Sequence, residues 1–205
     1  MSAPPVPDPA GRLLPDAPPR ERILATASRL FYAEGIHAVG MDRIVTEAET
    51  TRATLYRHFL GKEQLVQAYI KLADARIREL ADAAVATMSP GEALQAMVSG
   101  LGDQLCSPGF RGCPFINAAV EYPDPANPVS QAIAEHRNWY RSLLTRLLVD
   151  AGASEPDATA GTLMLLRDGA MTGAALGDQV SIRARFDRAA REVLESAGAF
   201  PRGRF

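Results

Sequence analysis

Residues 41–62 read MDRIVTEAETTRATLYRHFLGK, and this stretch decides the fold of the N-terminal part of the chain. Its apolar spacing predicts two short helices, Met41–Ala48 and Thr51–Phe59, separated by a tight turn. Helices of about two turns are not stable alone, so both must pack on the helix before them and the helix after them. This arrangement is typical of a helix-turn-helix unit that binds DNA.

The charges of the second short helix also favour DNA binding. No acidic residue occurs between Arg52 and Lys62. On a helix, Leu55 and Phe59 face inward, and the polar side chains between them point outward, where phosphates and base edges can be bound. The residues expected to contact DNA from this segment are Thr51, Arg52, Thr54, Tyr56, Arg57 and His58. Spacing alone leaves open an ordinary solvated helix.

Apolar periodicity and capping residues predict helices along the rest of the chain. A helix precedes the short pair and ends at Gly35, and a long one begins near Lys62. The expected buried stripe of this long helix is Leu65, Tyr69, Leu72 and Leu80. Later helices are expected to begin after Ser89, Cys113 and Asn127, near Ser154 and at Ser181. No alternating strand pattern and no internal repeat appears, so the chain is predicted to be all-α, with about nine helices.

Length and composition exclude several classes of protein. The chain has 205 residues, of which 47% are hydrophobic, and a net charge of −2. It has no run of about 18 apolar residues that would span a membrane, and no secretory signal. We therefore expect a cytoplasmic globular protein with no membrane partner. The charge argues against general coating of nucleic acid but leaves room for a local basic patch.

The sequence gives no support for a catalytic function or a metal-binding site. Two cysteines are too few for a disulfide scaffold or a zinc site. The three histidines are scattered, and neither a phosphate-binding loop nor a nucleophile motif occurs. We therefore expect that the chain is not an enzyme and that it holds neither a metal nor a cofactor.

Residues 20–65, RERILATASRLFYAEGIHAVGMDRIVTEAETTRATLYRHFLGKEQL, resemble the N-terminal domain of the TetR/AcrR family of transcriptional regulators, and the resemblance extends to about residue 72. It implies that Met41–Ala48 is the supporting helix and Thr51–His58 the recognition helix. It also places Lys62 at a phosphate contact, and Arg43 is expected to reach the DNA backbone.

The chain departs from the family pattern at two places. Glu49 and Thr50 stand in the turn where the family has Gly and then Val or Ile, so Glu49 either adopts a strained backbone or the turn differs. Gly40 stands where a Ser or Thr usually caps the supporting helix, so one phosphate contact is in doubt.

The resemblance implies a domain organisation and two further partners. We expect a disordered proline-rich tail over 1–19, a DNA-binding domain over 20–65, and a ligand-binding and dimerisation domain over 66–205. The implied function is that of a regulator, most simply a repressor, that binds a palindromic DNA operator as a homodimer and is released by a small molecule.

Two helices near the end, about 156–176 and 181–197, are expected to form the dimer interface. The glycines of the first recur at every fourth position, which favours close approach of another helix. The residues expected at this interface are Gly169, Gly173, Gly177, Phe186 and Val193. Tight packing within one subunit is the alternative.

The effector pocket is expected among the helices between about 90 and 176, where apolar side chains accompany a few polar ones. The candidate lining residues are Met97, Leu101, Phe115, Asn117, Trp139, Met164, Arg167, Asp168 and Met171. The alternative for most of them is a place in the ordinary core.

Cys113 precedes Pro114 at an expected helix start, where the helix dipole and Arg111 stabilise a thiolate. A redox-sensing regulator that uses this thiol is therefore an alternative function. A small buried residue is the simpler interpretation, and a Cys106–Cys113 disulfide requires the two sulfurs to meet. The other alternative is an all-α ligand-binding protein that does not bind DNA.

Overall fold

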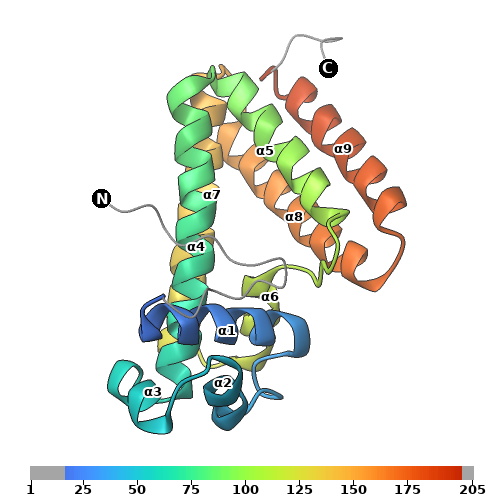
Figure 1. Ribbon diagram of the computed structural model, residues 1–205. Helices are drawn as coiled ribbons and strands as arrows, with labels where there is room; N and C mark the ends of the chain where they lie inside the picture. Colours follow the sequence, from blue (N-terminus) through green and yellow to red (C-terminus); the bar gives the residue numbers. More distant parts are fainter. Residues whose placement is uncertain (1–16, 200–205) are drawn as a thin grey trace. The chain divides into compact units, whose positions relative to one another are not determined.

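The computed structural model describes residues 17–199. Residues 1–16 of the predicted tail therefore lie outside the described residues. Nine helices and no strand occur in this range, which confirms the all-α prediction (Figure 1). The helices are α1 (Pro19–Glu34), α2 (Met41–Glu47), α3 (Arg52–His58), α4 (Lys62–Thr87), α5 (Pro90–Leu105), α6 (Pro114–Glu121), α7 (Pro128–Asp150), α8 (Pro156–Leu176) and α9 (Gln179–Ser196).

The helices divide between two compact units. Of the described residues, the first unit comprises 17–73 and Asn117–Ile133, and the second comprises Asp74–Ile116 and 134–199. Three helices, α4, α6 and α7, contribute residues to both units. None of the helices within 17–199 has the length and apolar character needed to cross a lipid bilayer.

The first unit is built around α1, α2 and α3, each of which packs on the other two (Figure 1). Two of these helices have only seven residues, so their position depends on the apolar side chains that they bury. The fully buried aliphatic side chains of this core include Ile23, Leu30, Ile36, Ile44, Leu55, Leu65 and Ile70.

Glu121, the last residue of α6, holds the loop between α1 and α2. Its carboxylate accepts hydrogen bonds from the backbone N–H of Ile36 at 2.8 Å and of His37 at 2.6 Å. The Nδ1 atom of His37 lies 2.6 Å from the same carboxylate, and the His37 ring stacks on Tyr122. Burial by itself raises the pKa of Glu121, but these hydrogen bonds outweigh it and hold the pKa below its ordinary value.

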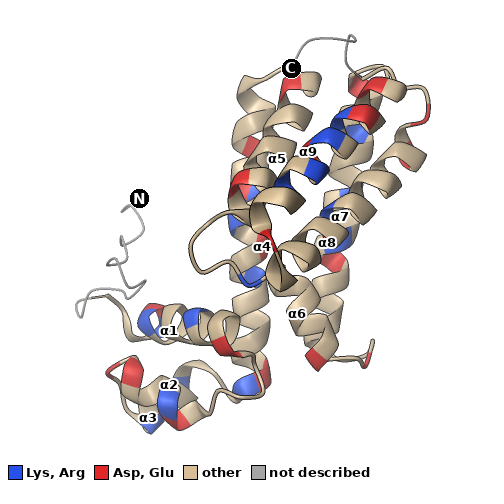
Figure 2. Cartoon of the chain, turned by 90° about the vertical axis from the view of Figure 1, so that its right-hand side faces the viewer, with Lys and Arg blue, Asp and Glu red and all other residues tan. Residues whose placement is uncertain are grey.

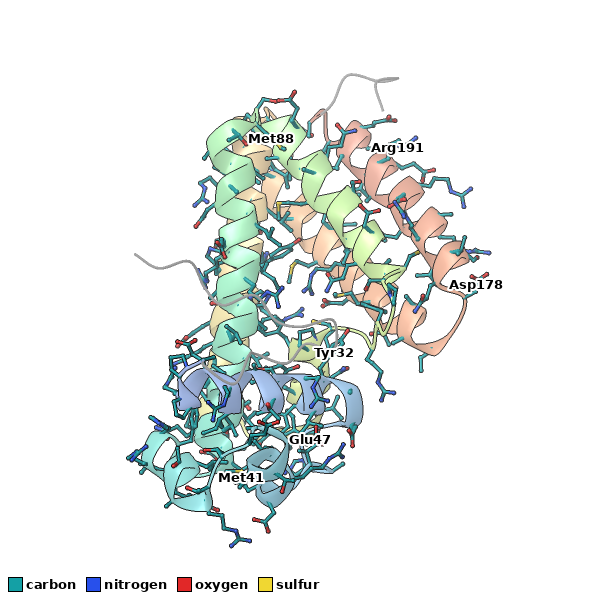
Figure 3. The ribbon with its side chains drawn as sticks, in the orientation of Figure 1. Tyr32, Met41, Glu47, Met88, Asp178 and Arg191 are labelled. Carbon is teal, nitrogen blue, oxygen red and sulfur yellow. The ribbon has the colours of Figure 1, made fainter. Side chains whose placement is uncertain are left out.

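The second unit packs α5 and α8 against each other and both against α9. Its helix starts follow capping rules. Ser89, one residue after Met88 (labelled in Figure 3), forms the expected capping box with Glu92 at the start of α5. At the start of α9 the predicted cap Ser181 is wrong, since the Asp178 side chain accepts from the backbone N–H groups of residues 180 and 181.

The predicted apolar stripe of α4 is only half buried. Leu65 and Tyr69 lie in the core, but Leu72 is 38% and Leu80 is 73% exposed. The prediction is wrong for the last two residues, because the stripe of a helix this long extends beyond the core that covers its beginning. Leu80 instead borders a cavity of the second unit.

Replacing Glu121 by Gln should lower the free energy of unfolding by about 1–2 kcal/mol at pH 7, because an amide cannot accept the same set of hydrogen bonds. A carboxyl whose folded pKa is lowered stabilises above its unfolded pKa and loses that contribution as the pH falls through the folded pKa. The difference between wild type and Glu121→Gln should therefore shrink below about pH 4.5.

Urea unfolding over a pH series measures this difference, with the exposed Glu79→Gln as a matched control. A difference that stays constant down to pH 3.5, or one that Glu79→Gln reproduces, would contradict the role of the Glu121 carboxylate.

Candidate functional site

Helix α3 presents the polar face that the sequence predicts. Thr51 caps it, since its Oγ1 accepts a hydrogen bond from the backbone N–H of Thr54 at 3.1 Å. Leu55 is fully buried, whereas Tyr56 is 46% exposed among exposed basic neighbours. Figure 2 shows the basic segments of α3 in blue. An exposed tyrosine beside two arginines suits contact with phosphates and base edges.

The guanidinium of Arg52 is paired with the carboxylate of Asp42 in α2. This pair raises the pKa of Arg52, and both side chains are about two-thirds exposed. An exposed ion pair adds little stability, so a nucleic acid can replace it at little cost. Asp42 therefore orients Arg52 without removing it from the exposed face.

The turn between α2 and α3 contains a strained residue. Glu49 has a φ of 49°, and it is the only described residue besides glycine with a positive φ. The guanidinium of Arg22 in α1 holds the turn, since it donates to the carbonyl oxygens of Ala48 at 3.3 Å and Glu49 at 3.1 Å. The first of the two sequence alternatives for Glu49, a strained backbone, is the one that the structure adopts.

Arg43 binds within the protein, and its predicted contact with the DNA backbone gains no support. Its guanidinium donates to Glu34 in α1 and to Glu47 in α2, which raises the pKa of Arg43 (Figure 3 labels Glu47). Glu47 also pairs with Arg29 of α1. These bonds tie α1 to α2, so we do not retain Arg43 as a phosphate contact.

Lys62, the first residue of α4, donates from Nζ to the carbonyl oxygen of His37 at 3.3 Å, and burial lowers the pKa of its ammonium. His58 lines a shallow groove of about 370 Å³ in which Arg20 and Lys71 are the other basic side chains. Sequence reasoning missed Arg20 and Lys71, because only packing brings α1 and α4 beside the recognition helix.

The second unit contains an open cavity of about 320 Å³. Four predicted pocket residues line it, namely Met97, Leu101, Arg167 and Met171. The residues that sequence reasoning missed are Ile77, Leu80, Ala81, Ala84, Ala96, Gly100, Gln104, Pro114 and Tyr140. Four of these nine residues come from α4, which lies outside the range in which the pocket was expected.

The other predicted pocket residues lie elsewhere. Phe115 is buried and stacks on the buried His136, with ring centroids 3.6 Å apart. Arg78 covers the Trp139 ring at 4.2 Å. Met164 is buried outside the cavity lining, and Asn117 is exposed in the first unit.

Asp168 does not line the cavity but pairs with both Arg137 and Arg167. It therefore acts on the cavity only through Arg167, which does line it. Among the described residues, no group of three metal-binding side chains comes together.

Cys113 is buried directly before α6, and its Sγ accepts a hydrogen bond from Nη2 of Arg167 at 3.7 Å. Neither Cys113 nor Cys106 forms a disulfide. Reaction with an oxidant requires an accessible thiolate. The 2% exposure of Cys113 therefore favours a packing role over the redox alternative.

Two of the predicted interface residues pack within the subunit. Phe186 is 6% exposed and lies in the interior of the second unit. At Gly173, an added Cβ would come within 3.2 Å of Ile182 in α9, so this glycine permits close packing of α8 on α9. By contrast, no atom lies within 4 Å of a Cβ added at Gly169.

A short recognition helix carried by a three-helix core defines a helix-turn-helix transcriptional regulator. Residues 23–69 match the family of bacterial regulatory proteins named tetR. Residues 90–181 match the C-terminal domain described as transcriptional regulator LmrA/YxaF-like. The chain belongs to the TetR family of DNA-binding transcriptional regulators, which are not enzymes, and it has an LmrA/YxaF-like C-terminal domain. The alternative of a protein that does not bind DNA is therefore wrong.

Individual relatives agree with this assignment. The chain is 32% identical to the HTH-type transcriptional regulator LmrA of Bacillus subtilis (strain 168), over 68% of this chain and 76% of that protein. The TetR-family regulator SCO4454 from Streptomyces coelicolor matches with a TM-score of 0.85 and 45% identity, over 88% of this chain and 96% of that chain. A tetr-transcriptional regulator (sav143) from Streptomyces avermitilis matches with a TM-score of 0.77 and 26% identity, over 88% and 98%.

Replacing Glu49 by Gly should raise the free energy of unfolding by about 0.5 kcal/mol. Relief of a left-handed backbone at a residue with a side chain is worth about 1–2 kcal/mol, and the extra freedom of glycine in the unfolded chain offsets part of it. Denaturant unfolding measures the change.

Glu49→Ala is the matched control, because it removes the same carboxylate but keeps a Cβ. An equal gain in stability from Glu49→Ala would show that charge, and not backbone strain, is relieved.

Proposed function

We propose that this regulator is a repressor that binds a palindromic operator as a homodimer and dissociates from it when a small molecule occupies the cavity of the second unit. The observation that carries the proposal is the presence in one chain of an exposed basic recognition helix and an open, mostly apolar cavity. Of the two alternatives that the sequence left open, a redox switch at Cys113 gives the cavity no role, and a ligand-binding protein that does not bind DNA gives the recognition helix none.

The proposed DNA contacts follow from exposure and chemistry. Arg52 and Tyr56 point away from the buried side of α3 and are assigned to base edges in the major groove. Phosphate contacts are assigned to Thr51, Thr54, Arg57, His58 and Lys62. Two recognition helices one DNA turn apart would read a near-palindrome.

Helix α4 supports the link between effector and DNA. Lys62 and Leu65 belong to the DNA-binding unit, whereas Ile77 and Leu80 of the same continuous helix line the cavity. A ligand that displaces the second half of α4 therefore acts on a helix that also contributes residues to the DNA-binding unit. Ligand and operator then oppose each other through a single coupling free energy, which is reciprocal.

An exposed, uncharged face of α8 supports the homodimer. Leu165 is 75% and Leu176 is 84% exposed, and Gly169 lies between them on the same face. Two large exposed apolar side chains on one uncharged helix face suit an interaction surface. Because no atom of the subunit fills the space above Gly169, the glycine suits the approach of a partner helix. Gly169, Gly177 and the half-buried Val193 remain predicted interface residues.

Purified protein should enrich a palindrome from genomic fragments of the source organism, as read by sequencing. An Arg52→Ala, Tyr56→Ala double variant should lose this enrichment, because both proposed base contacts are gone. Arg76→Ala, which changes an exposed arginine outside the DNA-binding unit, is the matched control and should keep it.

If the wild type showed no enrichment over the double variant even at low salt, where phosphate contacts are strongest, the operator proposal would be wrong. If enrichment is found, deletion of the regulator should raise transcription of the gene beside the palindrome. A fall in transcription would identify an activator instead.

Leu165→Glu should convert the dimer to a monomer, because two charges would be buried in the proposed interface. Sedimentation velocity measures the mass in solution. Val149→Glu introduces the same charge at an exposed position of α7 and should leave the dimer intact. A Leu165→Glu dimer as stable as the wild type would move the interface away from this face of α8.

A further inference from the structure

The cavity of the second unit has an apolar body and a single cationic side chain. Its volume of about 320 Å³ falls within the range of small-molecule sites. Its three polar side chains are Gln104, Tyr140 and Arg167, and no Asp or Glu lines it. The remaining lining side chains are aliphatic residues, methionines, alanines, one proline and one glycine.

Arg167 is held in a fixed orientation although it is 7% exposed. Its Nη1 donates to Asp168 at 2.8 Å and its Nη2 to the Cys113 sulfur at 3.7 Å. The guanidinium carbon lies 5.1 Å from the centre of the Tyr140 ring. A guanidinium has five N–H donors, so these contacts leave donors for a ligand.

The carboxylate of Asp168 offsets the charge of Arg167 only in part. Among the described residues it is the one carboxylate paired with Arg167, and it also accepts a hydrogen bond from Nη2 of Arg137 at 2.7 Å. Arg137 is 38% exposed and is also screened by water, whereas Arg167 is buried. A buried guanidinium that shares its carboxylate beside an apolar cavity favours an anionic ligand.

Tyr140 adds a second directional group. Burial raises the pKa of its phenol, so the hydroxyl is neutral at pH 7 and can donate to an oxygen of a ligand. Tyr140 and Arg167 also line a small apolar pocket next to the cavity, together with Leu94 and Phe186. The polar pair thus lies inside an otherwise apolar region and not at an outer rim.

We propose that the effector is an amphipathic anion, with a mostly apolar or aromatic body in the cavity and one acidic group, such as a carboxylate or sulfonate, bound by Arg167 and Tyr140. This inference rests on the proposed function of the cavity as the effector site. A cationic ligand would meet Arg167 with no carboxylate in the lining to oppose it, and a neutral ligand would leave the charge of Arg167 only partly offset.

The test compares two fluorescent probes that share one aromatic body. 1-Anilinonaphthalene-8-sulfonate carries a sulfonate, and N-phenyl-1-naphthylamine is the same skeleton without it. The full-length wild-type protein should bind the sulfonate at least about tenfold more tightly, as expected for one charge-assisted hydrogen bond in an apolar site. Equal affinities, or tighter binding of the neutral probe, would overturn the proposal.

Variants test whether Arg167 causes the preference for the sulfonate probe. Arg167→Met should remove the preference and leave the affinity for the neutral probe unchanged, whereas Arg167→Lys should keep most of the preference. Arg141→Met, which removes an arginine paired with Asp157 outside the cavity, is the matched control. A preference that survives in Arg167→Met would overturn the assignment to Arg167.

A blocking variant ties the signal to the cavity. No atom lies within 4 Å of an added Cβ at Gly100, so Gly100→Trp can be built there and should fill the entrance and abolish binding of both probes. If Arg167→Met does not fold, the wild-type protein decides the question. The quantity to compare is then the ratio of its affinities for the two probes, counting only the binding that Gly100→Trp abolishes.

The outcomes separate the two proposals. Binding of both probes in the cavity without preference for the anion would overturn the effector class and leave the effector site standing. Binding of neither probe would overturn the cavity as an effector site for molecules of this size. The operator selection described above tests DNA binding independently of both.

Discussion

The burial of Leu55 and Phe59 is the interaction on which the DNA-binding unit depends. Helix α3 has seven residues, of which Leu55 lies in the core at 0% exposure, and Phe59, directly after the helix, is buried at 1% exposure. So short a helix is not stable by itself, and these two side chains fix its orientation by removing apolar area from water. The guanidinium of Arg20 lies over the Phe59 ring at 5.3 Å and covers the anchor from α1. The outward direction of Arg52 and Tyr56 follows from this anchor.

Hydrogen bonds from two further side chains order the connections next to the short helices. Arg22 holds the strained turn at Glu49, and the carboxylate of Glu121 holds the loop that leads into α2. Both side chains use backbone groups as partners, so each orders a connection between helices. Helix α2 is thus held at both ends, and α3 at its beginning, by side chains that come from elsewhere in the chain.

The second unit places a charge where a core would ordinarily have none. Arg167 projects from α8 among apolar side chains and is kept there by Asp168 and by the ring of Tyr140. Replacing a buried ion pair by hydrophobic side chains of similar volume is often neutral or stabilising, so stability alone does not account for an arginine at this place. The free-energy cost of burying the Arg167 guanidinium is accounted for by the proposed ligand, and the open cavity beside Arg167 has room for it.

The sequence by itself determined the elements of this protein, because helix periodicity, caps and chain breaks are local. The capping box at Ser89, the start of α6 at Pro114 and the inward pair of α3 all follow from neighbours within a few residues. Only the tertiary structure decided which apolar residues are covered and which border a cavity. Leu65 and Leu80 belong to one predicted apolar stripe of α4, but Leu65 is buried and Leu80 borders the cavity, since burial depends on segments distant in the sequence.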